Sequence, residues 1–360
     1  MIFLRIACFL ILISVFIAGC QSDQDGSIQN EEAAGQSQAQ DTESVLKNMD
    51  VPWSIAKSDE NFYLSERTGQ IVKWNRDSDE LVIQKLNLKK TLHLEGEGGF
   101  LGLELASDFK ESKQAYAYHT YKEENTVKNR IVILEEKNGQ WTEIKVVLED
   151  IPGAQFHNGG RIKIGPDSKL YAAAGDSLNP ELAQNKDSLA GKILRIEPDG
   201  SVPADNPFPG SYVYSYGHRN PQGLAWDERG TLFSTEHGQS AHDEINRIQP
   251  GKNYGWPVIE GDEQREGMET PLYHTGDETW APSGIAYKEG KLYVATLSGK
   301  AVKTFEVHTG GVQTYLDGWG RMRDVMIEDD DLYAVTNNRD GRGNPVKEDD
   351  QMLLKKLTAQ

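Results

Sequence analysis

The sequence predicts an all-β fold, a six-bladed β-propeller, and three observations lead to this prediction. A short motif in which an apolar or aromatic pair opens a strand recurs six times, from "NFYLSE" to "DLYAVTNN". About ten residues before each copy stands a second apolar segment, and turn-forming links such as "GPDSK" join the two. After the first twenty residues, no stretch has the pattern of a long amphipathic helix. Repeated sheets placed radially would leave only short edges open.

The six copies follow one another along the chain at intervals of 40 to 62 residues. Their central aromatic residues are Tyr63, Tyr116, Tyr171, Phe233, Tyr293 and Tyr333. The segments before them read "PWSIA", "GFLGLEL", "GGRIKI", "NPQGLAW", "APSGIAY" and "RMRDVMI". Each interval has room for one four-stranded sheet with loops of variable length. A pair of β-sandwiches would also alternate short strands with turns, but regular spacing favours the propeller.

The beginning of the chain predicts export. Residues 1–19 are almost continuously apolar and end in small residues directly before Cys20, as in the signal segment of a bacterial lipoprotein. We expect Cys20 to carry a lipid, which would hold the protein to the outer face of a bacterial membrane without spanning it. An ordinary signal peptide with an incidental cysteine is the alternative. Residues 20–45 are polar and acidic, which predicts a flexible tether, and residues 46–360 form the predicted propeller domain.

Charge limits the kind of ligand. The formal net charge is −18, so nucleic acid is an unlikely partner. In a propeller the first strand of each blade lines the central channel, so residues just before these strands should meet at one mouth. Those residues are Glu97, His157, Arg219, Asn220, Ser283, Arg321 and Arg323, with Lys300 near the end of a second strand. A local group of cations in an acidic protein predicts a specific anionic ligand, and arginine suits planar carboxylates.

The segment "FHNGGRIKIGPDSKLYAAAGD" adds a candidate acid–base pair. It reads as two strands joined by a turn, so His157 and Asp176 should lie at the same end of the hairpin. Most histidines beside a turn only cap or solvate it, so the pair gains weight only from the other candidate residues expected at the same mouth. For the arginines, an alternative is a structural role, in which Arg321 and Arg323 pair with neighbours such as Asp324.

Four segments closely resemble the soluble PQQ-dependent glucose dehydrogenases and aldose sugar dehydrogenases. They are the hairpin segment above, "LAGKILRIEPDGSVPADNPF", "YGHRNPQGLAWDERGTLFSTEHG" and "DEINRIQPGKNYGWP", and the similarity runs from Val51 to about Asn338. The resemblance implies a six-bladed propeller that oxidises an aldose at its anomeric carbon to the lactone. Pyrroloquinoline quinone (PQQ) would accept the hydride at C5, and an external acceptor would then take the electrons.

The resemblance also implies roles for individual residues. His157 would be the general base and Asp176 the carboxylate that orients it. The quinone would be held by Glu97, Arg219, Asn220, Lys300, Arg321 and Arg323. The backbone carbonyls of Gly238 and Gln239 would bind a calcium ion at the quinone, and Glu244 with the backbone near Tyr254 would bind a second, structural calcium.

Some residues depart from the pattern of the glucose-specific enzymes. Phe156 stands where those enzymes have an aspartate before the catalytic histidine, and Ser298 aligns with their quinone lysine, which favours a broad range of aldoses. Two other functions stay open at this stage: a calcium-dependent propeller lactonase, and an exported propeller that binds sugar or protein without catalysis. A lactonase needs side-chain carboxylates around its metal, and a binding protein has no need of a His157–Asp176 pair.

Overall fold

The computed structural model describes residues 41–342 and 349–357. The predicted signal segment, the lipidated Cys20 and the tether as far as residue 40 lie outside the described residues. No helix in the described part of the chain is long and apolar enough to cross a membrane. Two four-residue helices, α2 (Phe109–Ser112) and α3 (Glu181–Gln184), are the α-helices of these ranges, and strands make up the rest of the regular structure. The all-β prediction is confirmed.

Eight strands of the N-terminal half form one sheet in the order β2-β3-β4-β5-β9-β8-β7-β6. Their bounds are β2 (Pro52–Ser58), β3 (Asn61–Glu66), β4 (Gln70–Asn75), β5 (Glu80–Asn87), β6 (Phe100–Leu105), β7 (Gln114–Glu123), β8 (Thr126–Lys137) and β9 (Gln140–Pro152). Each half of this sheet is an antiparallel meander. The halves are joined only where β5 and β9 pair in parallel over three residues, from Lys85 to Asn87 on β5.

Three further sheets contain four consecutive antiparallel strands each. The first has β10 (Ile162–Ile164), β11 (Leu170–Ala174), β12 (Lys192–Ile196) and β13 (Val213–Tyr216). The second has β14 (Pro221–Trp226), β15 (Leu232–Glu236), β16 (Glu244–Ile248) and β17 (Tyr273–His274). The third has β18 (Pro282–Lys288), β19 (Lys291–Thr296), β20 (Ala301–Glu306) and β21 (Val312–Leu316).

The last sheet joins the two ends of the described chain. Its order is β1-β24-β23-β22, built from β1 (Thr42–Met49), β22 (Met322–Glu328), β23 (Asp331–Thr336) and β24 (Asp350–Lys356). Thr42 lies opposite Lys355 in the antiparallel pair of β1 and β24. The ordered domain therefore starts earlier than predicted, because β1 begins among residues that the sequence analysis assigned to the tether.

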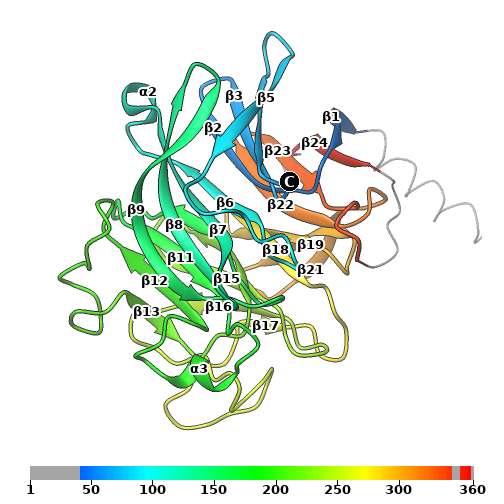
Figure 1. The fold of residues 1–360 in the computed structure, drawn as a ribbon. Helices are drawn as coiled ribbons and strands as arrows, with labels where there is room; N and C mark the ends of the chain where they lie inside the picture. Colours follow the sequence, from blue (N-terminus) through cyan, green and yellow to red (C-terminus); the bar gives the residue numbers. More distant parts are fainter. Residues whose placement is uncertain (1–40, 343–348, 358–360) are drawn as a thin grey trace, which may run out of the picture. The chain divides into compact units, whose positions relative to one another are not determined.

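Six strands, one from each meander, contact one another in a closed ring: β2, β6, β10, β14, β18 and β22, with β22 returning to β2. In Figure 1 the strands β1 and β24 lie side by side. Apolar clusters fill the spaces between the sheets. One cluster joins Trp53 of β2, Leu101 of β6 and Ile162 of β10. All five residues of β11 are buried, and its small alanines allow this close packing. Each large apolar side chain buried in this way stabilises the fold by about 1.5–3 kcal/mol.

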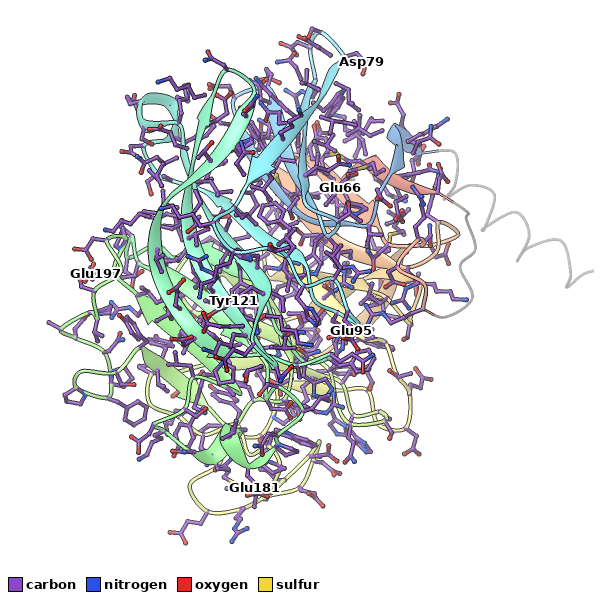
Figure 2. All side chains as sticks on the ribbon, in the orientation of Figure 1. Glu66, Asp79, Glu95, Tyr121, Glu181 and Glu197 are labelled. Atoms are coloured by element: carbon purple, nitrogen blue, oxygen red, sulfur yellow. The ribbon has the colours of Figure 1, made fainter. Side chains whose placement is uncertain are left out.

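Acidic side chains lie on the outside of this core. Figure 2 shows Asp79 at the tip of the β4–β5 hairpin and Glu181 on α3, both exposed. Their positions are consistent with the strongly negative net charge of the chain.

Candidate active site

His157 and Asp176 meet at one end of the β10–β11 hairpin, as the sequence predicts. His157 Nδ1 lies 2.7 Å from Asp176 Oδ1. The two glycines after His157 are needed for this approach, because Gly159 and Gly160 have φ angles of 64° and 107°. A Cβ on Gly159 would also lie 2.3 Å from the carbonyl oxygen of Ala173. The chain can therefore turn closely over β11 before it enters β10.

The Asp176 carboxylate is fully buried and held by three donors. Besides His157, the backbone N–H of Leu178 donates to Oδ1 at 2.9 Å and the indole Nε1–H of Trp256 donates to Oδ2 at 2.8 Å. Because Nδ1 of His157 faces this carboxylate, Nε2 is the ring nitrogen left for a substrate proton.

Glu97 connects three parts of the site. Its Oε2 accepts hydrogen bonds from the backbone N–H of His157 at 3.0 Å and from Asn220 Nδ2 at 3.5 Å, and its Oε1 accepts one from Arg342 at 2.6 Å. Burial alone would raise the pKa of Glu97, but the adjacent Arg342 guanidinium, together with the charge of Arg323, more than offsets this and lowers it to about 2. Glu97 is thus ionised at any physiological pH.

Replacing Glu97 with glutamine should make the fold less sensitive to acid. The folded-state pKa of about 2 lies below the ordinary 4.5, so the ionised carboxylate stabilises the fold above pH 4.5 and this contribution is lost as the pH falls toward 2. At about 1.4 kcal/mol per pKa unit, it amounts to at most about 3 kcal/mol at neutral pH. Urea unfolding of wild type and Glu97→Gln at about pH 7 and about pH 3 should show the difference in unfolding free energy shrinking with acid. An equal difference at both pH values would contradict this assignment.

Arg342 was not found by sequence reasoning. It lies in the loop after β23, outside the repeated motif, and its second contact is to Asp340 at 3.1 Å. Asp340 also accepts a hydrogen bond from Arg321 at 3.0 Å. Arg342 therefore links the predicted Arg321 to Glu97, and through Glu97 to His157.

Arg323 lies deepest among the predicted arginines, with 2% of its surface exposed. It donates to Gln222 Oε1 at 2.6 Å, to Ser283 Oγ at 3.2 Å and to Asn337 Oδ1 at 3.2 Å. Burial, and then the charges of Arg342 and Arg321, lower the pKa of Arg323 to about 9, although Asp340 and Glu97 act in the opposite direction. Among the described residues, the hydrogen bonds of the guanidinium go to neutral groups and none goes to a carboxylate.

The alternative that Arg321 and Arg323 form structural ion pairs with neighbours such as Asp324 holds only in part. Asp324, the neighbour in sequence, pairs with Arg161 at 2.8 Å, and not with Arg321 or Arg323. The buried Nε atoms of Arg219, Arg321 and Arg323 have no hydrogen-bond partner among the described residues. These cations thus retain donors for a ligand.

Arg219 approaches the same region from the start of β14. Its guanidinium donates to the carbonyl oxygens of His237 at 3.2 Å and Gln239 at 3.5 Å. The guanidinium carbon also lies 5.4 Å from the ring centre of Trp256, within the range of a cation–π contact.

A pocket of about 250 Å³ lies between these groups. Its lining includes the predicted residues Glu97, His157, Arg219, Gly238 and Gln239, together with Phe156, His237, Ser240, Asp243, Thr279 and Ala281. Lys300, which lies in the β19–β20 turn, is not part of this lining, and neither are Asn220, Arg321 and Arg323.

His237 is a site residue that the sequence analysis missed. Burial lowers its pKa to about 4, so the imidazole is neutral at physiological pH. Its Nε2 is buried without a partner among the described residues. It directly precedes Gly238 in the segment "EHG". The sequence analysis assigned a role there only to backbone carbonyls, and not to the histidine side chain.

Two of the predicted calcium ligands, Glu244 and Tyr254, line a second, smaller cavity next to His237. It is also lined by Arg219, Glu236, Gly238 and Glu260. Burial and the nearby Glu236 raise the pKa of Glu244 to about 8, so this carboxyl group lacks a cationic partner. Glu260 Oε1 is also buried without a partner among the described residues.

Side chains alone do not make a metal cluster in the described part of the chain, where no three His, Cys, Asp or Glu residues converge closely enough. A cation here would need backbone oxygens as well, as the family resemblance implies for Gly238 and Gln239. The loop that carries these two residues is fixed by Asp243, which accepts the backbone N–H of Gly238 at 2.9 Å and that of Trp280 at 2.6 Å. A lactonase built on converging carboxylates is not favoured by this arrangement.

Ser215, His218 and Glu236 have the hydrogen bonds of a hydrolytic triad. Ser215 Oγ lies 2.8 Å from His218 Nε2, and His218 Nδ1 lies 2.8 Å from Glu236 Oε2. Ser215 and His218 are fully buried, however, and Glu236 Oε1 accepts the backbone N–H of Arg219 at 2.8 Å. The three side chains hold the backbone in front of β14 and offer no accessible nucleophile.

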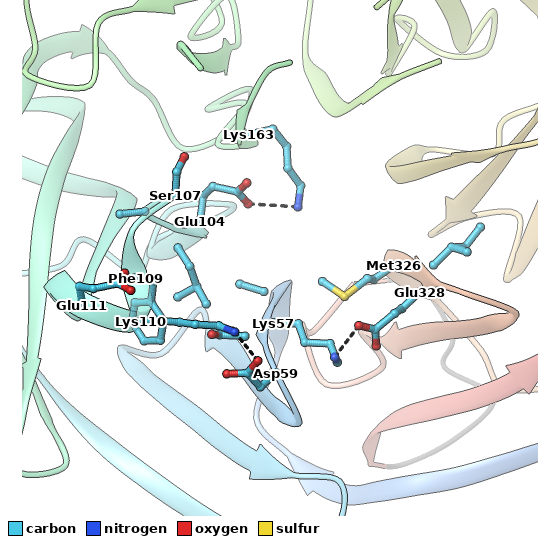
Figure 3. A pocket seen from close by; sticks show the side chains of 15 residues that line it. Lys57, Asp59, Glu104, Ser107, Phe109, Lys110, Glu111, Lys163, Met326 and Glu328 are labelled. Carbon is cyan, nitrogen blue, oxygen red and sulfur yellow. Dashed lines mark hydrogen bonds and ion pairs between the residues drawn. The ribbon is translucent and has the colours of Figure 1, made fainter. Parts of the chain in front are cut away.

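A larger pocket lies elsewhere, where strands β2, β6 and β22 end (Figure 3). It measures about 700 Å³, and each of its three lysines is paired with a carboxylate: Lys57 with Glu328, Lys110 with Asp59, and Lys163 with Glu104. It has neither an unpaired cation nor a histidine. The smaller pocket at the opposite ends of these strands is therefore the candidate active site.

Comparison with known proteins gives the class of the protein. Over 261 residues it is 33% identical to quinoprotein glucose dehydrogenase B of Acinetobacter calcoaceticus, a match covering 64% of this chain and only 55% of that relative. Over 338 residues it is 28% identical to the aldose sugar dehydrogenase YliI of Escherichia coli, covering 83% of this chain and 90% of that protein. The PQQ-bound aldose sugar dehydrogenase of Streptomyces coelicolor superimposes with a TM-score of 0.80 at 38% identity, covering 87% and 96% of the two chains.

The protein is thus an oxidoreductase with the fold of the β-propeller dehydrogenases. The model of the Glucose / Sorbosone dehydrogenase family matches residues 49–353, and the chain belongs to that family. The resemblance seen in the sequence motifs is confirmed.

Proposed function

We propose that this protein is a PQQ- and calcium-dependent aldose sugar dehydrogenase built as a six-bladed propeller. The single observation that carries the proposal is the union of the His157–Asp176 pair with Arg219 and Glu97 around one pocket. The ring of six inner strands supports six blades, with the eight-stranded sheet counted as two blades joined at β5 and β9.

The residues present suit the quinone. PQQ is a flat tricarboxylate, and Arg219, Arg321 and Arg323 each keep a buried Nε–H without a partner among the described residues. Paired guanidinium donors are suited to carboxylates, and a buried cation binds an anion more strongly than an exposed one does. Glu97 lines the pocket and Asn220 donates to Glu97, so both would help to fix the orientation of the ring. Lys300, Asn220, Arg321 and Arg323 lie outside the lining of this pocket, so their contact with the quinone is part of the proposal.

In the proposed reaction, bound PQQ supplies the acceptor for a hydride from the sugar. Nε2 of His157 takes the proton of the anomeric hydroxyl, which leaves a lactone once the C–H bond has also been broken. Asp176 holds the ring through Nδ1 and stabilises the imidazolium that forms. Half-buried Phe156 offers the sugar an apolar surface and no hydrogen-bonding group, which supports a broad range of aldoses.

Calcium would bind at two places in this proposal. The carbonyl oxygens of Gly238 and Gln239 would hold one ion at the pocket, and Glu244 with the backbone of Tyr254 would hold a second one. The uncompensated buried carboxyl groups of Glu244 and Glu260 support the second site, since a hard divalent cation prefers oxygen ligands.

One reconstitution experiment tests the proposal. The metal-free apo-protein is mixed with PQQ, calcium, both or neither, and dye reduction is followed with a panel of aldoses and with a lactone as a hydrolase control. We expect aldose oxidation only with both additions, and its loss on chelation and return on adding calcium. Aldose oxidation without PQQ, or lactone hydrolysis alone, would overturn the assignment.

We also propose that the enzyme is exported and anchored through a lipid on Cys20. The apolar residues 1–19 with small residues before Cys20 support this location.

A further inference from the structure

Trp256 contacts both the Asp176 carboxylate and the Arg219 guanidinium of the proposed site. The sequence analysis predicted no role for it. It follows β16 in a loop and is 8% exposed. Its backbone N–H donates to the carbonyl oxygen of Gly217 at 3.0 Å, and its own carbonyl accepts a hydrogen bond from Gln184 at 2.7 Å. The indole therefore projects from a backbone that is fixed on both sides.

The indole of Trp256 therefore contacts a carboxylate that orients the proposed base and a guanidinium that would bind the cofactor. Its Nε1–H donates to Asp176 Oδ2 at 2.8 Å, and its ring lies 5.4 Å from the guanidinium carbon of Arg219. Asp176 Oδ1 is already occupied by His157 and the backbone N–H of Leu178. The indole N–H is the only side-chain donor to Oδ2 among the described residues.

We propose that Trp256 is a positioning residue for the base. By holding Oδ2 it fixes the plane of the Asp176 carboxylate, so that Oδ1 stays aligned with Nδ1 of His157. A fully buried carboxylate with one oxygen unsatisfied is costly, and the group would turn about its last bond to find another donor. Such a turn would break the alignment with His157. The proposal rests on the proposed function, because it assumes that His157 is the base.

A purely structural role for Trp256 predicts something different. Phenylalanine keeps most of the buried apolar area and an aromatic face for Arg219, and it removes only the N–H group. If packing alone mattered, Trp256→Phe would change stability slightly and leave the His157 ring in place.

The first test uses the apo-protein and needs no quinone. In ¹⁵N-histidine NMR spectra, the ring resonances of His157 are identified by their absence from His157→Gln. Trp256→Phe should shift or broaden these resonances. The matched control is Trp280→Phe, which alters a tryptophan that is 6% exposed and packs on Tyr273, and it should leave them unchanged.

The second test uses the loaded enzyme. Trp256→Phe should lower kcat by about tenfold or more, the size expected for a lost hydrogen bond to a charged group, while the KM for the sugar and the quinone affinity of the apo-protein stay within about threefold. In an Asp176→Asn background the same substitution should have much less further effect on kcat, because the charged carboxylate that the indole N–H holds in place has been replaced.

Unchanged His157 resonances, or a kcat loss that simply adds to that of Asp176→Asn, would overturn the proposal. Thermal unfolding of each variant shows whether it is folded. If the wild type with PQQ and calcium oxidises no aldose, the proposed function fails, whereas the NMR comparison still decides whether Trp256 positions His157.

Discussion

Alanine in place of His157 should give an enzyme that binds its quinone but turns over about 10²–10⁴-fold more slowly, the range that general base catalysis supplies. Turnover falls because no other group takes the proton of the anomeric hydroxyl. Quinone binding persists because the side chain of His157 is bonded to Asp176 and not to the arginines. The backbone N–H that donates to Glu97 is also retained in the variant. Steady-state dye reduction gives kcat, and titration of the apo-protein with PQQ gives the affinity.

The control for this variant is His308→Ala, which removes an exposed histidine after β20. It should keep wild-type turnover. Turnover of His157→Ala within about threefold of wild type would remove His157 as the base. A parallel loss of quinone binding would mean that the substitution disturbs the pocket as a whole.

Glutamine in place of Arg323 should weaken quinone binding by about 10- to 100-fold. A hydrogen bond between charged groups contributes about 1.5–3 kcal/mol, and each 1.4 kcal/mol is a factor of ten in affinity. Among the described residues the buried guanidinium of Arg323 hydrogen-bonds only neutral groups, so its charge is available to an anionic ligand. PQQ titration of the apo-protein at several salt concentrations measures the change.

Arg339→Gln serves as the matched control, because that arginine is 45% exposed at its side chain and pairs with Asp50 outside the pocket. Arg321→Gln should weaken binding in the same direction as Arg323→Gln. Thermal unfolding confirms that each variant is folded. An unchanged PQQ affinity in both folded variants would show that these arginines hold the protein together and do not hold the cofactor.

The hairpin pair could be predicted from sequence because its geometry is local. His157 and Asp176 stand at similar distances from the turn in "GPDSK", so antiparallel pairing of two short strands brings them together. To predict that Glu97 and Asn220 lie near this pair, one further inference was needed. The repeated motif had to be recognised as a set of sheets whose first strands surround a central channel.

Other parts of the site could not be found in this way. Arg342 and Trp256 come from loops outside the repeated motif, and their contacts to Glu97 and Asp176 depend on how those loops cross the sheets. The pairing of Arg323 with Asp324 was a poor alternative for a physical reason. Successive side chains in a strand point to opposite faces, and in β22 Asp324 turns away to Arg161.

The start of the domain was also predicted too late. The segment "TESVLKNM" has few apolar residues, and its buried positions, Leu46 and Met49, do not form a regular alternation. Its strand conformation comes from pairing with β24, more than three hundred residues away in sequence. A pattern within one segment does not reveal such a distant partner.

That pairing has a consequence for how the molecule is made. The sheet that completes the ring takes its edge strand from the first described residues and its next strand from the last ones. The middle meanders can form from pairings that are local in sequence, whereas β24 must pair with β1 from the far end of the described chain. Closure is therefore a late event with a high contact order, and folding should be slow compared with proteins whose contacts are local. Until β24 is in place, the edge of β23 that it pairs with has no partner strand.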